Sequence, residues 1–272
     1  MNPDQAQSVV ARCLTDPNFL LRAYDRTHSV IPGDGTAEDI AAEILGGVEL
    51  ERLRRFRGFI TKVKHNALRR RIPATLGLMG ALGVELSFFC DFSPAYVAAR
   101  QDGPLGTRRH LDLFSNALSA FLLEQPEETS IPVAETFEHE YQIFDLSEGP
   151  SVVTETAHVR WRGAMTLSRR SIDVIRICER LALRNFSRDD IVTRPHVLFY
   201  WRPEAVESVS IHEVDALTAA VFTALRAGGG PEQTRRVLAD VGLSKVDAES
   251  LRATAVAIAG RGFLELRGDW LR

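Results

Sequence analysis

An acidic segment with one histidine is the first candidate in the sequence for a metal-binding or catalytic site. The segment is ETFEHEYQIFD, residues 135–145. Its polar members at helix positions i, i+3, i+4 and i+7 are Glu135, Glu138, His139 and Gln142. Carboxylates and a histidine on one helix face can hold a metal ion. However, the spacing is Glu-x-x-x-His rather than the Glu-x-x-His of di-iron bundles, and the sequence has no second copy. We therefore expect a solvated helix face, and keep a metalloenzyme as a third hypothesis.

The remaining candidates for catalysis are single residues. His65, His196 and His212 have no serine, cysteine or aspartate at a spacing typical of a catalytic triad. The sequence contains no G-x-x-x-x-G-K-[ST] motif and no G-x-G-x-x-G after a strand. The three glycines at 228–230 are better explained as the end of a helix. We expect a chain that is not an enzyme by itself.

The composition is that of a folded globular protein. The chain has 272 residues, of which 45% are hydrophobic and 25% charged. No apolar run reaches the roughly 18 residues of a membrane span, and the first residues lack the apolar stretch of a secretory signal. The three cysteines, Cys13, Cys90 and Cys178, are far apart, which is typical of reduced thiols. We expect a cytoplasmic protein that has no membrane partner.

Two segments carry opposite charge. Residues 52–71 hold nine Lys/Arg and no acid, and residues 124–148 hold eight acids and no Lys/Arg. A basic helix could follow a phosphate backbone. The net charge of −3 favours instead a solvated or partner-facing surface, which the acidic segment could neutralise. Nucleic acid is therefore not an expected partner.

Hydrophobic periodicity predicts a mainly α fold with a small β component. We expect an N-terminal helical domain over 1–150, a connecting strand and helix over 151–192, and a compact module over 193–272. In the first domain, Leu111, Phe114, Leu118 and Phe121 form one helical stripe. Leu76 to Leu86 predict another helix, and Pro132 suits the first turn of a third.

The last 80 residues have the clearest pattern. VLFYW is an apolar strand, RPEA a turn, and VESVSI, residues 206–211, an alternating strand. Three helices follow, the third with Leu251, Ala255 and Ile258 facing inward, and FLELRG, residues 263–268, is a short final strand. This order of elements predicts a winged-helix-like module.

The third helix of this module distinguishes two functions. A reader of DNA bases needs Arg, Lys, Asn or Gln on its recognition helix. ESLRATAVAIAGRG, residues 249–262, is instead dominated by small apolar residues, which suit a groove for an apolar side chain. The strand at 206–211 could also expose an edge to which an extended peptide adds. We expect peptide binding, and keep a winged-helix DNA-binding regulator as the alternative.

The module resembles the peptide-recognition element of systems that mature ribosomally made peptides. That element has a hairpin, then a T-A-A-x-[IV]-[WF]-x-x-L-x-x-G helix, and later a Gly-Phe/Leu-Leu turn. The matching residues of the helix are Thr218, Ala219, Ala220, Val221, Phe222, Leu225 and Gly228. The matching residues of the turn are Gly262, Phe263 and Leu264.

Over residues 50–270 the chain is similar to a family of partner subunits, also classed as a DNA-binding-domain family. Members accompany multinuclear non-haem iron oxidative enzymes that modify cysteines of a precursor peptide, as in methanobactin and thiaglutamate biosynthesis. The resemblance implies a non-catalytic subunit of a heteromeric complex. It would bind the precursor peptide and present it to the oxidase, which would hold the iron, so this chain needs no cofactor.

The resemblance also implies which residues bind the peptide. Strand addition would use the edge at Val206, Ser208, Ser210 and Ile211. The floor of the groove would be Arg252, Ala255, Val256 and Ala259 of the third helix. The register is not fixed by sequence, because a slip of one residue exchanges the two faces of a strand.

Overall fold

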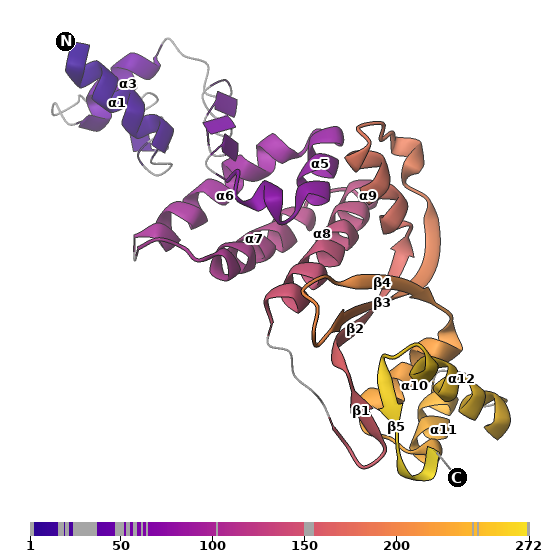
Figure 1. The fold of residues 1–272 in the computed structure, drawn as a ribbon. Helices are drawn as coiled ribbons and strands as arrows, with labels where there is room; N and C mark the ends of the chain where they lie inside the picture. The colour runs from indigo at the N-terminus through magenta and orange to yellow at the C-terminus, as the bar shows by residue number, and fades with distance from the viewer. Residues whose placement is uncertain are drawn as a thin grey trace. The chain divides into compact units, whose positions relative to one another are not determined.

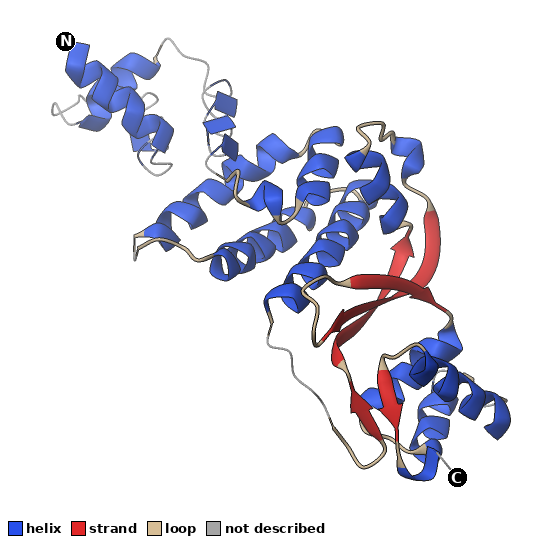
Figure 2. Ribbon diagram, viewed as in Figure 1, coloured by secondary structure: helices blue, strands red, loops and turns tan. Residues whose placement is uncertain are grey.

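The computed structural model describes residues 3–15, 37–46, 65–101, 103–149, 155–240, 242–243 and 245–270, and isolated positions between 19 and 63. The chain divides into two compact units, Met1–Ala134 and Glu135–Arg272. The described residues are mainly helical, with two small antiparallel sheets (Figures 1 and 2). The predicted fold class, mainly α with a small β component, is confirmed. The division falls inside a helix and not at residue 150.

The first unit is helical in its described part. Its elements are α1 (Pro3–Thr15), α3 (Ala37–Leu45), η1 (Leu68–Arg70), α5 (Pro73–Ala81), α6 (Glu85–Arg100), α7 (Thr107–Leu122) and the first turns of α8 (Glu127–Glu148). The stripe predicted on α7 is buried, as expected. The helix predicted over Leu76 to Leu86 is broken, because Gly83 has φ +80° between α5 and α6. Pro132 lies inside α8 rather than in its first turn.

Two cations of the basic segment, Lys62 and Arg69, pair with an acid that the sequence did not indicate. Glu85 is buried at the start of α6, and its carboxylate accepts hydrogen bonds from Lys62 and Arg69. The expected partner was the acidic segment 124–148. From residue 135 onward, acids of that segment bind other residues: Glu135 binds Ser171, and Glu138 binds Arg170. Residues between 51 and 64 lie partly outside the described residues, so the predicted helix over this segment is described only in pieces.

In its described part, the second unit combines a three-stranded sheet and a two-stranded sheet with seven helical segments. Its elements are the rest of α8, β1 (Val159–Trp161), β2 (Gly163–Ile172), α9 (Val174–Ala182), η2 (Arg188–Asp190), β3 (Thr193–Pro203), β4 (Ser210–Val214), α10 (Ala216–Arg226), α11 (Pro231–Asp240), α12 (Ala248–Gly260), β5 (Leu264–Leu266) and η3 (Gly268–Trp270). The larger sheet has the order β2-β3-β4, and β1 pairs with β5. All pairs are antiparallel.

The two faces of the larger sheet have different chemistry. On one face Phe199 of β3 stacks on Phe222 of α10, with ring centroids 4.1 Å apart, and Phe263 meets Phe199 edge-on. These residues belong to an apolar core that the C-terminal helices complete. On the other face Tyr200 and Arg202 of β3 bond to α8 and the residue after it. The sheet is therefore covered on both faces (Figure 2).

Two strands differ from the predicted ones. Residues 163–172 form β2, a ten-residue strand for which the sequence predicted only a connecting strand and helix over 151–192. The second strand of the hairpin starts at Ser210 and not at Val206, because residues 204–209 form the connection to β3. The predicted order of strand, strand, three helices and short strand is confirmed by β3, β4, α10, α11, α12 and β5.

Gly228 is fixed by the close approach of another segment. It ends α10 with φ +79°, and a Cβ at this position would lie 2.9 Å from Thr156 Cγ2. Gly262, after α12, has a similar φ of +80°, but a Cβ there would meet no atom of another described segment within 4 Å. Comparing the two glycines separates the cost of the backbone conformation from that of the contact.

We predict that Gly228→Ala destabilises the second unit more than Gly262→Ala. The conformational cost of about 1 kcal/mol applies to both substitutions, whereas only the first adds a steric clash. The three tryptophans, Trp161, Trp201 and Trp270, all lie in this unit, so urea unfolding followed by tryptophan fluorescence measures it selectively. Thr156→Ser, which removes Cγ2 and keeps the hydroxyl, should recover the difference. Equal losses for the two alanine variants would contradict the argument.

Candidate functional site

The polar face of α8 binds the sheet. The carboxylate of Glu135 accepts hydrogen bonds from the backbone N–H groups of Ser171 (2.9 Å) and Ile172 (3.1 Å), and from Ser171 Oγ (2.6 Å). The pairing of β2 with β3 shifts register between Arg170 and Ile172, and such a bulge leaves backbone groups without ladder partners. Glu135 supplies the acceptors that these N–H groups need.

A second part of this face surrounds a buried cation. The side chain of Arg170 is 0% exposed and pairs with Glu138. His139 Nδ1 lies 2.8 Å from the hydroxyl of Tyr200. Burial, with the charges of Arg170 and His196, lowers the pKa of His139 to about 4. Burial likewise raises the pKa of Tyr200, so His139 and Tyr200 are both neutral near pH 7.

These contacts change the interpretation of the first motif. Glu135, Glu138 and His139 each have a structural partner. The expected solvated helix face is therefore only partly correct, because Glu138 is 59% exposed whereas His139 is buried. Within the described ranges, no three His, Cys, Asp or Glu residues are grouped to hold a metal ion. The motif therefore joins α8 to the sheet.

Cys178 is the cysteine of the second unit. Burial, with the nearby charges of Glu140 and Glu179, raises the pKa of its thiol to about 12. A thiol of this pKa is protonated at neutral pH and is a poor nucleophile. The arrangement does not provide an activated cysteine.

The predicted strand residues divide between a loop and an edge strand. Val206 is 47% exposed and Ser208 is also exposed, and both lie in the connection before β4. Their predicted place in the strand is therefore wrong. Ser210 and Ile211 begin β4, which pairs with β3 on one side only. Between 210 and 214, no backbone hydrogen bond other than that ladder is found in the described part of the chain.

The predicted groove residues of α12 also divide. Ala255 is 0% exposed and belongs to the apolar core, so its predicted place on a groove floor is wrong. Arg252 is exposed, Val256 is 53% exposed and Ala259 is half-buried. These three stand at helix positions i, i+4 and i+7, so they share one accessible face.

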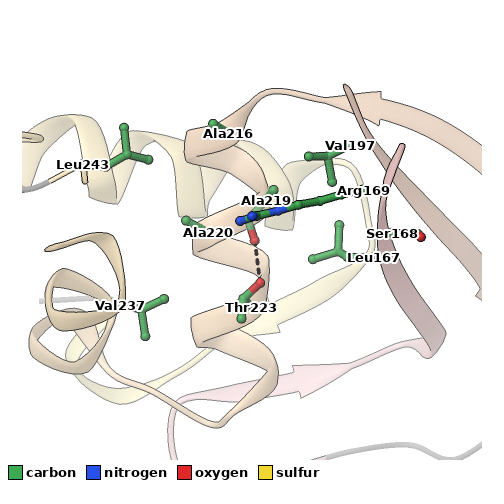
Figure 3. Close-up of a pocket in the computed structure, with 10 residues that line it drawn as sticks. All are labelled: Leu167, Ser168, Arg169, Val197, Ala216, Ala219, Ala220, Thr223, Val237 and Leu243. Atoms are coloured by element: carbon green, nitrogen blue, oxygen red, sulfur yellow. Dashed lines mark hydrogen bonds between the residues drawn. The ribbon is translucent and has the colours of Figure 1, made fainter. Parts of the chain in front are cut away.

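A pocket that the sequence analysis did not identify lies between the sheet and the C-terminal helices (Figure 3). Its volume is about 380 Å³, within the usual size of ligand pockets. Its lining residues are Leu167, Ser168 and Arg169 of β2, Val197 of β3, Ala216, Ala219, Ala220 and Thr223 of α10, Val237 of α11, and Leu243. Among these, Arg169 is the charged residue, and no acid lines the pocket.

The pocket exists because one stripe of α10 is made of short side chains. Ala216, Ala219, Ala220 and Thr223 recur at helical spacing along it. The Thr223 hydroxyl donates to Ala219 O at 2.8 Å, so it is occupied within the helix (Figure 3). The bulky residues of α10, such as Phe222 and Leu225, are buried in the core. The stripe of small residues on α10 is the feature of the sequence that could have indicated this pocket. The stripe borders a cavity only because β2 lies opposite it.

Comparisons with known proteins do not assign this chain to a family. Neither the protein-family models nor the curated proteins give a match to this chain. In the described helices, no segment is long and apolar enough to cross a membrane.

We predict that Glu135→Ala destabilises the second unit by about 1–3 kcal/mol, because it leaves partly buried backbone N–H groups without acceptors. Urea unfolding followed by tryptophan fluorescence measures this loss. Glu179→Ala, at an exposed position of α9, is the matched control and should change stability by less than about 0.5 kcal/mol. Similar effects of the two substitutions would show that Glu135 does not support the bulge.

His139 predicts a loss of stability in weak acid. Its pKa is about 4 in the folded chain and 6.5 in the reference state, so the unfolded state binds the proton first as pH falls. Stability is therefore complete above pH 6.5 and decreases toward pH 4, by about 2 kcal/mol at pH 5. His139→Asn keeps a polar atom near the Nδ1 position and should lose this part of the pH dependence. Parallel pH profiles for the two proteins would contradict the assignment.

Proposed function

We propose that this chain is a non-catalytic partner subunit that binds a ribosomally made precursor peptide and presents it to a multinuclear non-haem iron oxidase that modifies a cysteine of the peptide. The element order of the second unit supports the proposal, since a hairpin is followed by three helices and a short strand. The iron would belong to the oxidase. In this proposal the second unit is a winged-helix-like recognition module.

One observation carries the proposal: β4 is a sheet edge without a partner strand in the described part of the chain. Such an edge offers backbone donors and acceptors to an extended peptide. The same module holds α12, whose accessible face contains Arg252, Val256 and Ala259. The peptide backbone would pair with Ser210–Val214, and α12 would contact its side chains.

Co-purification tests the proposal at the level of class. The chain is expressed with its genomic neighbours and isolated, and the associated proteins and metals are identified. An iron-containing oxidase in stoichiometric amount, with a cysteine-bearing peptide that binds the pair, is the expected result. Isolation without an oxidase, and with duplex DNA whose binding weakens steeply with salt, would replace the proposal by a winged-helix regulator.

We predict that Val256→Glu weakens binding of the precursor peptide by about tenfold or more, because it places a charge on the face of α12 that the peptide contacts. Fluorescence anisotropy with a labelled peptide measures the dissociation constant. Leu183→Glu is the matched control, since Leu183 is 70% exposed and follows α9. An unchanged affinity of the Val256 variant, with its unfolding midpoint preserved, would remove α12 from the binding surface.

A further inference from the structure

The larger sheet has a second edge without a partner strand in the described part of the chain. In the order β2-β3-β4, β2 is paired on one side by β3. From 164 to 170, and within the described residues, the backbone of β2 forms no hydrogen bond outside that pairing. This edge spans seven residues, compared with the five residues of β4, and is therefore long enough to accept an extended peptide segment.

The pocket of Figure 3 lies beside this edge, because three of its lining residues, Leu167, Ser168 and Arg169, are consecutive residues of β2. Leu167 and Arg169 share the face of the sheet that meets α10, since side chains alternate along a strand. Ser168 therefore belongs to the opposite face. A peptide strand added to β2 would place every second side chain on the face that carries the pocket.

Arg169 gives the pocket its charge preference. It extends from β2 toward α10 (Figure 3), and among the described residues it has no hydrogen bond or ion pair. Its neighbour Arg170 is buried and paired with Glu138 on the other face. An exposed guanidinium that has no partner among the described residues, beside a mostly apolar pocket, complements a carboxylate next to an apolar group.

We propose that the β2 edge and this pocket form a second peptide site, which binds an extended segment with an apolar residue and an acidic residue at positions i and i+2. Opposite Leu167 the apolar side chain enters the pocket, and opposite Arg169 the carboxylate pairs with the guanidinium. The spacing follows from the strand, because only alternate residues share a face. This site is separate from the β4 edge and does not depend on the proposed function.

Short peptides and methyl NMR spectroscopy of the full chain test the site. The probes are the acetylated peptide amides TTLTETK and its reversed-order form TTETLTK. Their controls are TTLETTK, which has the same composition as the probes with adjacent leucine and glutamate, and TTLTQTK, which lacks the charge. We expect at least one probe to shift the methyl resonances of Leu167, Val197 and Leu243. The controls should bind about threefold more weakly or worse.

Variants of the chain locate the contacts. Arg169→Glu should weaken the binding of the probe about tenfold, and Ala219→Phe should abolish it by filling the pocket. Arg226→Glu is the matched control, because Arg226 is exposed on α10 and does not line the pocket. Tryptophan-detected unfolding confirms that each variant is folded.

Several results would overturn this site. Shifts at Ile211 without shifts at the pocket methyls would place the peptide on β4, which removes the second site but supports peptide capture there. Equal binding of TTLETTK would remove the spacing rule, and absence of binding would remove the site. If 4-methylpentanoate binds as tightly as the probe, the pocket is a small-carboxylate site. A wild-type dimer that Arg169→Glu dissociates would show that the β2 edge binds a second copy of the chain.

Discussion

The buried guanidinium of Arg170 is the constraint on which the second unit depends. A buried charge is stable only when it is paired, so α8 must bring Glu138 to this face of the sheet. The same turns of α8 bring Glu135 to the bulge of β2 and His139 to Tyr200. These polar contacts commit one face of the sheet to α8. The opposite face packs its apolar core against the C-terminal helices, so the two edges and the pocket beside β2 are what remain for binding.

The sequence predicts the part of this unit whose pattern is local. β3, β4, α10, α11, α12 and β5 occur in the predicted order, because each has a periodic apolar face. The pattern of β2 does not reveal a strand, because β2 is covered on both faces and one of them is polar. Met165 and Leu167 face the apolar core, whereas Arg170 faces α8. A search for alternating apolar residues does not detect such a strand. Its buried Arg170 is paired with Glu138, about 30 residues earlier in the chain.

The residues of the recognition-element resemblance have structural roles. Val221, Phe222, Leu225, Phe263 and Leu264 are buried in the core, and Gly228 and Gly262 adopt positive φ. Such a pattern therefore describes a fold more directly than a binding surface. This also explains why the predicted site is only partly correct. The small side chain of Ala255 suggests the floor of a groove. However, Ala255 shares the inward face of α12 with Leu251 and Ile258, and all three residues are buried.

The two open edges of one sheet raise the question of what Arg169 does. A charged residue on an edge strand can simply prevent edge-to-edge aggregation, whether it points outward or inward. Arg169 is exposed, and it also lines a pocket on the face that meets α10. The neighbouring stripe of α10 leaves this volume open where larger residues would fill it. A protective charge does not need a cavity beside it, whereas recognition of an acidic and apolar segment needs both. The combination therefore favours binding at β2 over protection of its edge.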